Sequence, residues 1–327
     1  MLVVGFLIIV ALAFDFMNGF HDAANSVATI VSTRVLTPRQ AVVWAAFFNF
    51  VAAFGFGVHV ATTVGKDIVD PSVVTNSVVF AGLAAAILWD VLTWFYGLPT
   101  SSSHALIAGF AGAGLAAAGP GAVMIDGVTK VFVFIFISPA LGLILGVVFM
   151  TLVMFLVRHN TPARVDSRFR RLQLLSAACY SLGHGTNDAQ KTMGVITALL
   201  VSSHHLEQFE VPAWVKLTCG AAIALGTSFG GWRIVKTMGM RITKLQPIGG
   251  CCAETAGAIT IIGAALAGIP VSTTHTITGA IVGVGASRRI SAVRWGVARN
   301  VVWAWILTVP GTAIIAAAIY EAIAPFR

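Results

Sequence analysis

Long apolar segments separated by short polar connections make up nearly the whole chain. The apolar segments carry almost no charge, and most are long enough to cross a hydrocarbon core of about 30 Å as helices. Lys and Arg fall instead in the connections between them. The pattern predicts an all-α integral membrane protein with apolar segments at approximately 1–31, 40–62, 76–97, 102–118, 128–157, 173–201, 213–229, 248–268, 272–286 and 292–319.

Two of these segments, 102–118 and 272–286, are short for a complete membrane crossing. Each follows a proline and a run of hydroxyl residues, and proline followed by hydroxyls favours the start of a helix. We therefore expect both segments to be half-helices or arms of re-entrant hairpins.

Two motifs each occur twice along the chain, in the same order and at nearly the same separation. The segment 19–25 (GFHDAAN) is matched by 185–191 (GTNDAQK), and the segment 99–104 (PTSSSH) by 270–275 (PVSTTH). Two unlike motifs recurring in this way indicate a duplication. The predicted organisation is a first repeat at 1–157, a basic cytoplasmic connection at 158–172, and a second repeat at 173–327.

The charges of the connections predict how the repeats are oriented. The connection after the first segment contains Arg34 and Arg39, whereas its counterpart in the second repeat, 202–212, contains acidic residues and no Lys or Arg. The other matched connections differ in the same way, with the basic member in the opposite repeat. Since basic loops stay in the cytoplasm, we expect two inverted-topology repeats with broken helices, as in many secondary transporters. Both termini would then lie outside.

Composition excludes other classes of protein. Of the 327 residues, 57% are hydrophobic and 10% are charged, whereas soluble domains carry about 25% charged residues. The net charge of +8 is concentrated in short loops, which membrane topology explains better than a nucleic acid partner does. We expect the lipid bilayer as a partner and no nucleic acid.

Polar residues inside the apolar segments form a matched pair of stripes. Asn18, Asp22 and Asn25 are spaced to share one helical face, and His184, Asp188 and Lys191 repeat that spacing. Buried charge is costly in a membrane, so such residues usually face a cavity or a partner. Interhelical hydrogen bonding is the alternative explanation.

Glycines lie beside both stripes, at positions 19, 183 and 185. A helix interrupted there would expose N-terminal amides that can hold an anion such as phosphate. The hydroxyl runs 101–103 and 272–274 could donate hydrogen bonds to a tetrahedral oxyanion, with ordinary helix capping as the alternative. Glu254, which precedes the second run, is a candidate carboxylate for a coupling ion or a gate.

At these residues the chain resembles the inorganic phosphate transporter family called PiT, specifically its compact bacterial members. The similarity covers nearly the whole chain and is carried by the segments 18–25 and 185–190 and by the paired runs after Pro99 and Pro270. The resemblance implies import of phosphate, bound between the two repeats, in symport with a cation across the inner (plasma) membrane. It also implies a homodimer, because such proteins are often dimeric.

The residue assignments follow from the motifs and the resemblance together. The predicted coupling-ion residues are Asp22, Asp188 and Glu254, and no metal ligands are assigned. We expect no cofactor apart from the coupling cation. The predicted substrate-binding residues are Asn25, Ser101, Ser102, Ser103, Gln190, Lys191, Ser272, Thr273 and Thr274.

The chain departs from the sodium-coupled pattern of this family, in which both repeats tend to read Asn-Asp-x-Ala-Asn. His21 precedes the first aspartate, and the second motif ends in Gln190-Lys191. A fixed lysine charge could replace a sodium ion or attract the anion. We therefore hypothesise proton rather than sodium coupling, with phosphate entering as a neutral metal–phosphate complex as a further hypothesis.

Three other functions compete with this interpretation. A sulfate or other oxyanion permease would share the architecture, but sulfate cannot donate a hydrogen bond to buried carboxylates. An anion channel would not depend on an ion gradient. An intramembrane hydrolase would need a nucleophile or a metal-ligand motif, and the sequence contains no convincing one. The chain is therefore predicted not to be an enzyme.

Overall fold

The computed structural model describes residues 2–55 and 57–326, and its regular elements are helices. The first half contains α1 (Leu2–Ser32), α2 (Pro38–Ala52), α3 (His59–Lys66), α4 (Asn76–Tyr96), α5 (Ser102–Ala118) and α6 (Ile125–Val157). The second half contains α7 (Pro162–Ser202), α8 (Ala213–Phe229), α9 (Trp232–Lys236), α10 (Pro247–Leu266), α11 (Thr273–Arg288) and α12 (Trp295–Ala322). Short turns of other helix types, η1 (Pro71–Val73), η2 (Pro120–Ala122), η3 (Thr237–Arg241), η4 (Ile290–Ala292) and η5 (Ala324–Phe326), lie in the connections.

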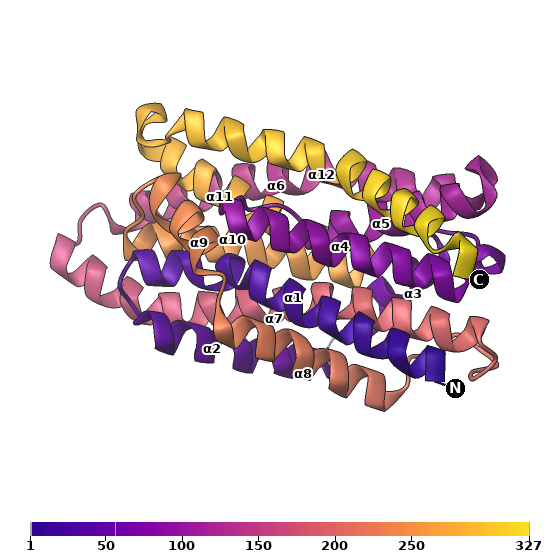
Figure 1. The fold of residues 1–327 in the computed structure, drawn as a ribbon. Helices are drawn as coiled ribbons and strands as arrows, with labels where there is room; N and C mark the ends of the chain where they lie inside the picture. Colours follow the sequence, from indigo (N-terminus) through magenta and orange to yellow (C-terminus); the bar gives the residue numbers. More distant parts are fainter. Residues whose placement is uncertain (1, 56, 327) are drawn as a thin grey trace.

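The helices form one elongated bundle, and both ends of the chain lie at the same end of it (Figure 1). Within the described residues, α1, α4, α6, α10 and α12 are long and apolar enough to cross a membrane. The prediction of an all-α, multi-pass membrane protein is confirmed. Each half has the same order of elements: a long helix, a divided pair, a hairpin and a second long helix. The inverted relation of the halves and the boundaries 1–157, 158–172 and 173–327 stay predictions.

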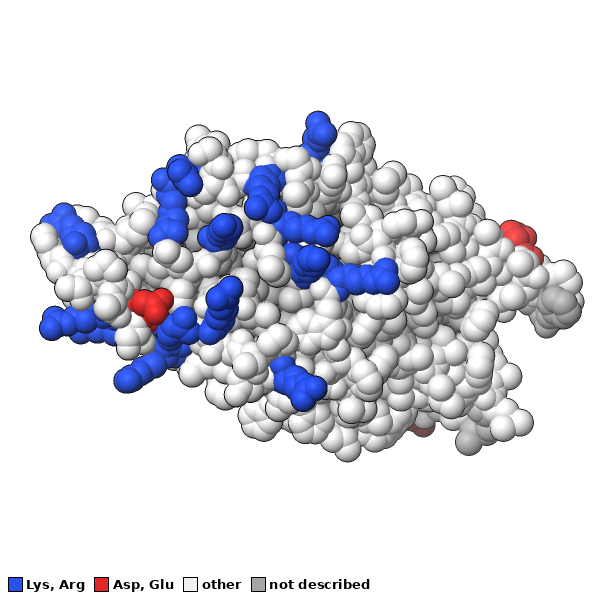
Figure 2. Space-filling model, turned by 60° about the vertical axis from the view of Figure 1, so that its left-hand side comes forward, with Lys and Arg blue, Asp and Glu red and all other residues white. Residues whose placement is uncertain are grey.

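The charged and apolar surfaces divide as a membrane requires. Figure 2 shows Lys and Arg gathered on the end of the bundle that lies to the left in Figure 1. The positive-inside rule predicts that this end faces the cytoplasm. The sides of α6 and α12 expose large apolar residues such as Phe136, Phe155, Trp303 and Ile306, which are compatible with lipid and not with water.

Two hairpins bring their tips into the bundle. The first consists of α4 and α5, and its turn begins at Gly97 with a φ of 67°, a left-handed conformation that favours glycine. The second hairpin consists of α10 and α11. Ser101 accepts a hydrogen bond from the backbone N–H of His104 and so caps α5, and Ser272 caps α11 by accepting from the backbone N–H of His275. The short helices predicted after the two hydroxyl runs are confirmed, and both begin inside the bundle.

Two expected boundaries differ from the structure. The apolar segment 40–62 is divided into α2 and α3 by a turn that includes Gly57, whose φ is 74°. The connection 158–172 is mostly helix, because α7 already starts at Pro162, a residue favoured at the first helical position. An ion pair of 2.9 Å between Asp166 and Arg170, one turn apart, supports this basic first part of α7.

The expected helix breaks at Gly19, Gly183 and Gly185 were wrong, because α1 and α7 are continuous through these positions. The glycines permit close helix packing instead. A Cβ atom on Gly19 would lie 2.2 Å from the carbonyl oxygen of Ile223, and one on Gly185 would lie 2.5 Å from that of Asn49. Small residues at such crossings are typical of membrane helix interfaces.

Candidate functional site

The polar stripes of α1 and α7 meet the tips of both hairpins in the interior of the bundle. The side chains at this meeting point are at most 3% exposed, so the site is enclosed in this conformation. The stripes pack there because α1 and α7 cross each other, and the hairpin tips approach them from either side. Four elements that are distant in sequence thus contribute to one polar cluster.

Asp22 of α1 is the centre of the first half of the cluster. Its Oδ1 lies 2.7 Å from Nδ1 of His21 and accepts a 3.5 Å hydrogen bond from Ser102. Its Oδ2 accepts from Thr274 of the other hairpin at 3.4 Å. The ring of His21 is oriented by Thr93 of α4, whose Oγ1 is 3.1 Å from Nε2. Asp22 is therefore linked to both hairpin tips, through rather long bonds.

Asp188 of α7 is the centre of the second half and has a fixed cation beside it. The ammonium group of Lys191 donates hydrogen bonds to Asp188 Oδ1, to the hydroxyl of Ser103 and, at 3.0 Å, to the carbonyl of Val271. Asp188 Oδ2 accepts from Thr273 at 2.9 Å. The lysine thus connects its own helix to both hairpins.

Asn25 joins the two halves directly. Its amide donates to the hydroxyls of Thr273 at 3.2 Å and Thr274 at 2.9 Å. Among the predicted substrate-binding residues, this cluster includes Asn25, Lys191 and the hydroxyls that follow the helix starts, Ser102, Ser103, Thr273 and Thr274.

The helix starts themselves add positive potential. The first N–H groups of α5 and α11 have no partner inside their own helices, and a helix N-terminus carries a partial positive charge. Both termini lie at the cluster, so their amides can hold an anion. Ser101 and Ser272, also predicted as ligands, use their hydroxyl oxygens as caps for these helices.

A cation could also be held at the cluster. Asp22, His184 and Asp188 each offer a ligand atom, and these atoms lie within 4.8 Å of one another. Nε2 of His184 is 3.1 Å from Oδ2 of Asp188, and Nδ1 is 3.2 Å from the amide oxygen of Asn49. Anion-binding and cation-binding groups are therefore adjacent.

Glu254, predicted as a coupling-ion residue, lies in a separate network. It accepts hydrogen bonds from Thr29 at 2.6 Å, from Gln173 at 2.9 Å and from Ser176 at 2.5 Å. This buried network ties α10 to α1 and α7. The structure does not bring Glu254 together with the two aspartates, so its part in coupling stays a prediction.

Gln190 is also used differently from the other predicted ligands. Its amide oxygen accepts hydrogen bonds from the backbone N–H groups of Val60 at 2.9 Å and Ala61 at 3.4 Å. These are free donors at the start of α3, so Gln190 satisfies a helix end in the break between α2 and α3.

Several polar residues of the site were missed by the reasoning from sequence. Asn49 and Thr93 orient the two histidines, and each lies in the interior of an apolar segment, where a polar residue could have been noticed. Asp15 and Asp90 stand out in the sequence as acidic residues within apolar segments that have no assigned role, and both are fully buried in the structure.

An enclosed polar site at the tips of two hairpins, in a bundle of membrane-spanning helices, defines the protein as a membrane transporter. The model of the phosphate transporter family matches residues 18–316. The chain belongs to this family, and it is an inorganic phosphate transporter rather than an enzyme. The resemblance seen in the sequence is thereby confirmed.

Relatives of the chain cover nearly its whole length. It is 60% identical to a probable low-affinity inorganic phosphate transporter of Rhizobium meliloti, over 97% of this chain and 95% of the relative. It is 46% identical to a protein of the same description in Bacillus subtilis, over 96% and 95%. A solved structure titled "The sodium-dependent phosphate transporter" superposes with a TM-score of 0.92 at 27% identity, covering 100% of both chains.

Proposed function

We propose that this protein imports inorganic phosphate across the inner (plasma) membrane by proton symport, with phosphate held between the hairpin tips. The hydroxyls of Ser102, Ser103, Thr273 and Thr274, the amide of Asn25 and the starts of α5 and α11 would surround the anion. Asp22 and Asp188 would take part in coupling. Both are enclosed at the place where the anion donors converge.

The observation that carries the proton assignment is the position of Lys191. Its ammonium group is held by a carboxylate, a hydroxyl and a backbone carbonyl. An all-oxygen set of this kind suits a hard cation such as sodium. A tethered ammonium at that place leaves no room there for a transported sodium ion, but it leaves proton movement unhindered.

The charges of the site favour coupling. The bonded group of Asp22, Asp188 and Lys191 leaves one negative charge, to which phosphate would add one or two more, and ionised carboxyls of the buried Asp15 and Asp90 would increase this excess. Such an excess is unfavourable in an enclosed site of low polarity. Protons bound at the carboxylates or the adjacent His21 and His184 would offset it, and imidazole is suited to proton exchange near neutral pH.

Phosphate is favoured over sulfate by the same groups. Phosphate retains a proton near neutral pH and can donate a hydrogen bond to a carboxylate, whereas sulfate is fully ionised and would be repelled. The printed descriptions of the two bacterial relatives also specify inorganic phosphate.

The decisive experiment is uptake of labelled phosphate by purified protein in liposomes. An inward proton gradient should drive uptake in sodium-free buffer, and excess unlabelled sulfate should not compete. Uptake that requires sodium and ignores a pH gradient would contradict proton coupling. Uptake that needs no gradient at all would indicate a channel.

Sodium coupling is the second candidate, since the superposing structure is titled as sodium-dependent. Asp22, His184 and Asp188 offer a place for a cation beside Lys191. The same group also suits a divalent ion that enters with phosphate as a neutral complex. Uptake measured with and without a chelator such as EDTA tests that form of the substrate, and uptake unaffected by EDTA would exclude it.

A further inference from the structure

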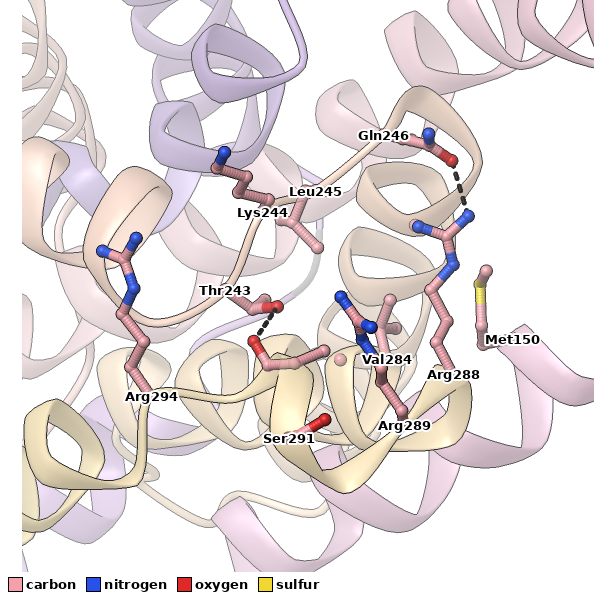
Figure 3. A pocket seen from close by; sticks show the side chains of 13 residues that line it. Met150, Thr243, Lys244, Leu245, Gln246, Val284, Arg288, Arg289, Ser291 and Arg294 are labelled. Atoms are coloured by element: carbon pink, nitrogen blue, oxygen red, sulfur yellow. Dashed lines mark hydrogen bonds between the residues drawn. The ribbon is translucent and has the colours of Figure 1, made fainter.

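A cavity of about 520 Å³ lies among Lys and Arg side chains near the start of α10 and the end of α11 (Figure 3). One wall is the segment 243–246, which leads into α10. The other wall is formed by the end of α11 and the connection to α12, with Met150 of α6 at the side. The cavity therefore lies at the open end of the second hairpin.

Four cations and no acidic residue line this cavity. Lys244 comes from the first wall, and Arg288, Arg289 and Arg294 extend from the second wall towards it (Figure 3). None of the four forms an ion pair with any residue that the structure describes. Retention of a loop in the cytoplasm requires basic residues on this face, but it does not require them to surround a cavity.

Two hydrogen bonds to uncharged acceptors connect the two walls. Arg288 donates to the side-chain oxygen of Gln246 at 2.6 Å, and Thr243 donates to the backbone carbonyl of Ala292 at 3.1 Å. The walls are therefore held at a fixed spacing, while the charges of Lys244, Arg289 and Arg294 remain without a counterion from the protein. A preformed group of unpaired cations is suited to binding an anion.

We propose that this cavity is a cytoplasmic binding site for an anion that carries two or more phosphoryl groups. Arginine forks bind phosphoryl oxygens with two parallel hydrogen bonds, and lysine adds a point charge. Four cations match the charge of a diphosphate better than that of a single phosphate. Soluble pyrophosphate compounds and the two-phosphate headgroup of cardiolipin both offer this chemistry.

Occupation of the cavity would regulate transport. The ligand would connect Lys244, which precedes α10, to Arg289 and Arg294, which follow α11. It would thus hold these two ends of the hairpin together. The tip of the same hairpin supplies Thr273 and Thr274 to the enclosed site, about 22 Å away along α11. Transporters built from repeats change access by movement of one repeat or bundle against the other, and a bound anion that fixes one end of this hairpin would oppose such movement and slow uptake.

The binding test uses the purified full chain titrated with inorganic pyrophosphate. The variant Arg289→Gln/Arg294→Gln should bind at least about tenfold more weakly, because two charge-assisted contacts are lost. The matched control is Arg164→Gln/Arg168→Gln, which removes two exposed arginines on α7 and should bind as wild type. A wild type that binds neither pyrophosphate nor cardiolipin, or a control that loses binding equally, overturns the proposal.

A second variant separates this site from the transport site. Asp188→Asn removes a residue of the enclosed cluster and should leave pyrophosphate binding unchanged. Failure of phosphate uptake in the wild type would refute the proposed function without affecting the binding result. Loss of pyrophosphate binding in an Asp188→Asn preparation that still shows a folded protein by its thermal unfolding transition would instead place the ligand in the enclosed site and refute the cavity proposal.

The uptake test identifies the source of the ligand. Phosphatidylcholine vesicles are prepared with and without cardiolipin, and with and without pyrophosphate on the side that the basic end faces. We expect either cardiolipin or pyrophosphate to slow uptake by the wild type and to leave uptake by Arg289→Gln/Arg294→Gln unchanged. The compound that has this effect is the ligand of the cavity. Equal uptake by both proteins in every arm contradicts the regulatory role.

Discussion

The two halves of the enclosed site are built on equivalent positions but differ in charge. Asp22 and Asp188 occupy matching places in α1 and α7, and each accepts a hydrogen bond from a threonine of the second hairpin. Each aspartate has a histidine beside it, His21 at Asp22 and His184 at Asp188, but only Asp188 also has a lysine, Lys191. The residue that matches Lys191 in the first half is the neutral Asn25.

This difference indicates that the two aspartates have separate tasks. The carboxylate of Asp188 is paired with a cation that cannot leave, so its charge is permanently balanced. The carboxylate of Asp22 has an imidazole and long hydroxyl contacts beside it, and we propose that a transported cation balances its charge. We therefore expect Asp22 to be the main coupling residue and Asp188 to organise the site.

The largest expected effect comes from replacing each aspartate with asparagine. Asp188→Asn should lower proton-driven uptake by about 1,000-fold, since breaking a buried charge pair costs roughly 3–5 kcal/mol. Asp22→Asn should abolish proton-driven uptake, because it removes the carboxylate that we expect to carry the coupling. Only Asp188→Asn should also lower the midpoint of thermal unfolding in detergent, because it leaves the Lys191 ammonium unpaired. The unfolding midpoint and uptake are measured on the same preparations.

A double variant checks the cause of this instability. Asp188→Asn combined with Lys191→Met removes both charges and should restore the unfolding midpoint while uptake stays lost. If Asp22→Asn destabilises the protein as much as Asp188→Asn does, the two halves are equivalent and the division of tasks is wrong.

The next effect is a change of coupling ion in Lys191→Asn, which gives the second half the residue found in the first. Proton-driven uptake should fall by about 100-fold, as loss of one partner of a buried charge pair costs 2–5 kcal/mol. Sodium should now stimulate uptake, because the oxygens of Asp188, Ser103 and Val271 are free to bind it. Lys130→Asn, which removes an exposed lysine, is the control; a Lys191→Asn variant with unchanged coupling refutes the proposal.

The smallest effects come from the hydroxyls that donate to the aspartates. Thr273→Ala removes a 2.9 Å hydrogen bond to Asp188, and Ser102→Ala removes a 3.5 Å contact to Asp22. A hydrogen bond to a charged group contributes roughly 1.5–3 kcal/mol, so Thr273→Ala should weaken phosphate affinity by about tenfold. Ser102→Ala should have a smaller effect, and for both variants the phosphate concentration for half-maximal uptake is the measurement. A larger effect of Ser102→Ala than of Thr273→Ala would show that contacts with the substrate matter more than these hydrogen bonds to the aspartates.

The helices and the site motifs could largely be predicted from the sequence. The lengths of the apolar segments alone located most of the helices, since a chain crosses a hydrocarbon core mainly as an apolar helix. Duplication then pointed to Asp22, Asp188 and the hydroxyl runs, because chance does not repeat two unlike motifs in order. The glycines were misinterpreted, since a glycine that breaks a helix and one that admits a neighbouring helix look alike in a sequence.

The sequence by itself determined the membrane class, the family and the candidate residues of the site, because these depend on hydrophobicity and on motifs that are local along the chain. Only the tertiary structure decided how those residues are paired. The contacts of Lys191 with both hairpins, of Glu254 with α1 and α7, and of Gln190 with α3 join segments far apart in sequence. Such pairings depend on how the helices pack, which no local pattern specifies.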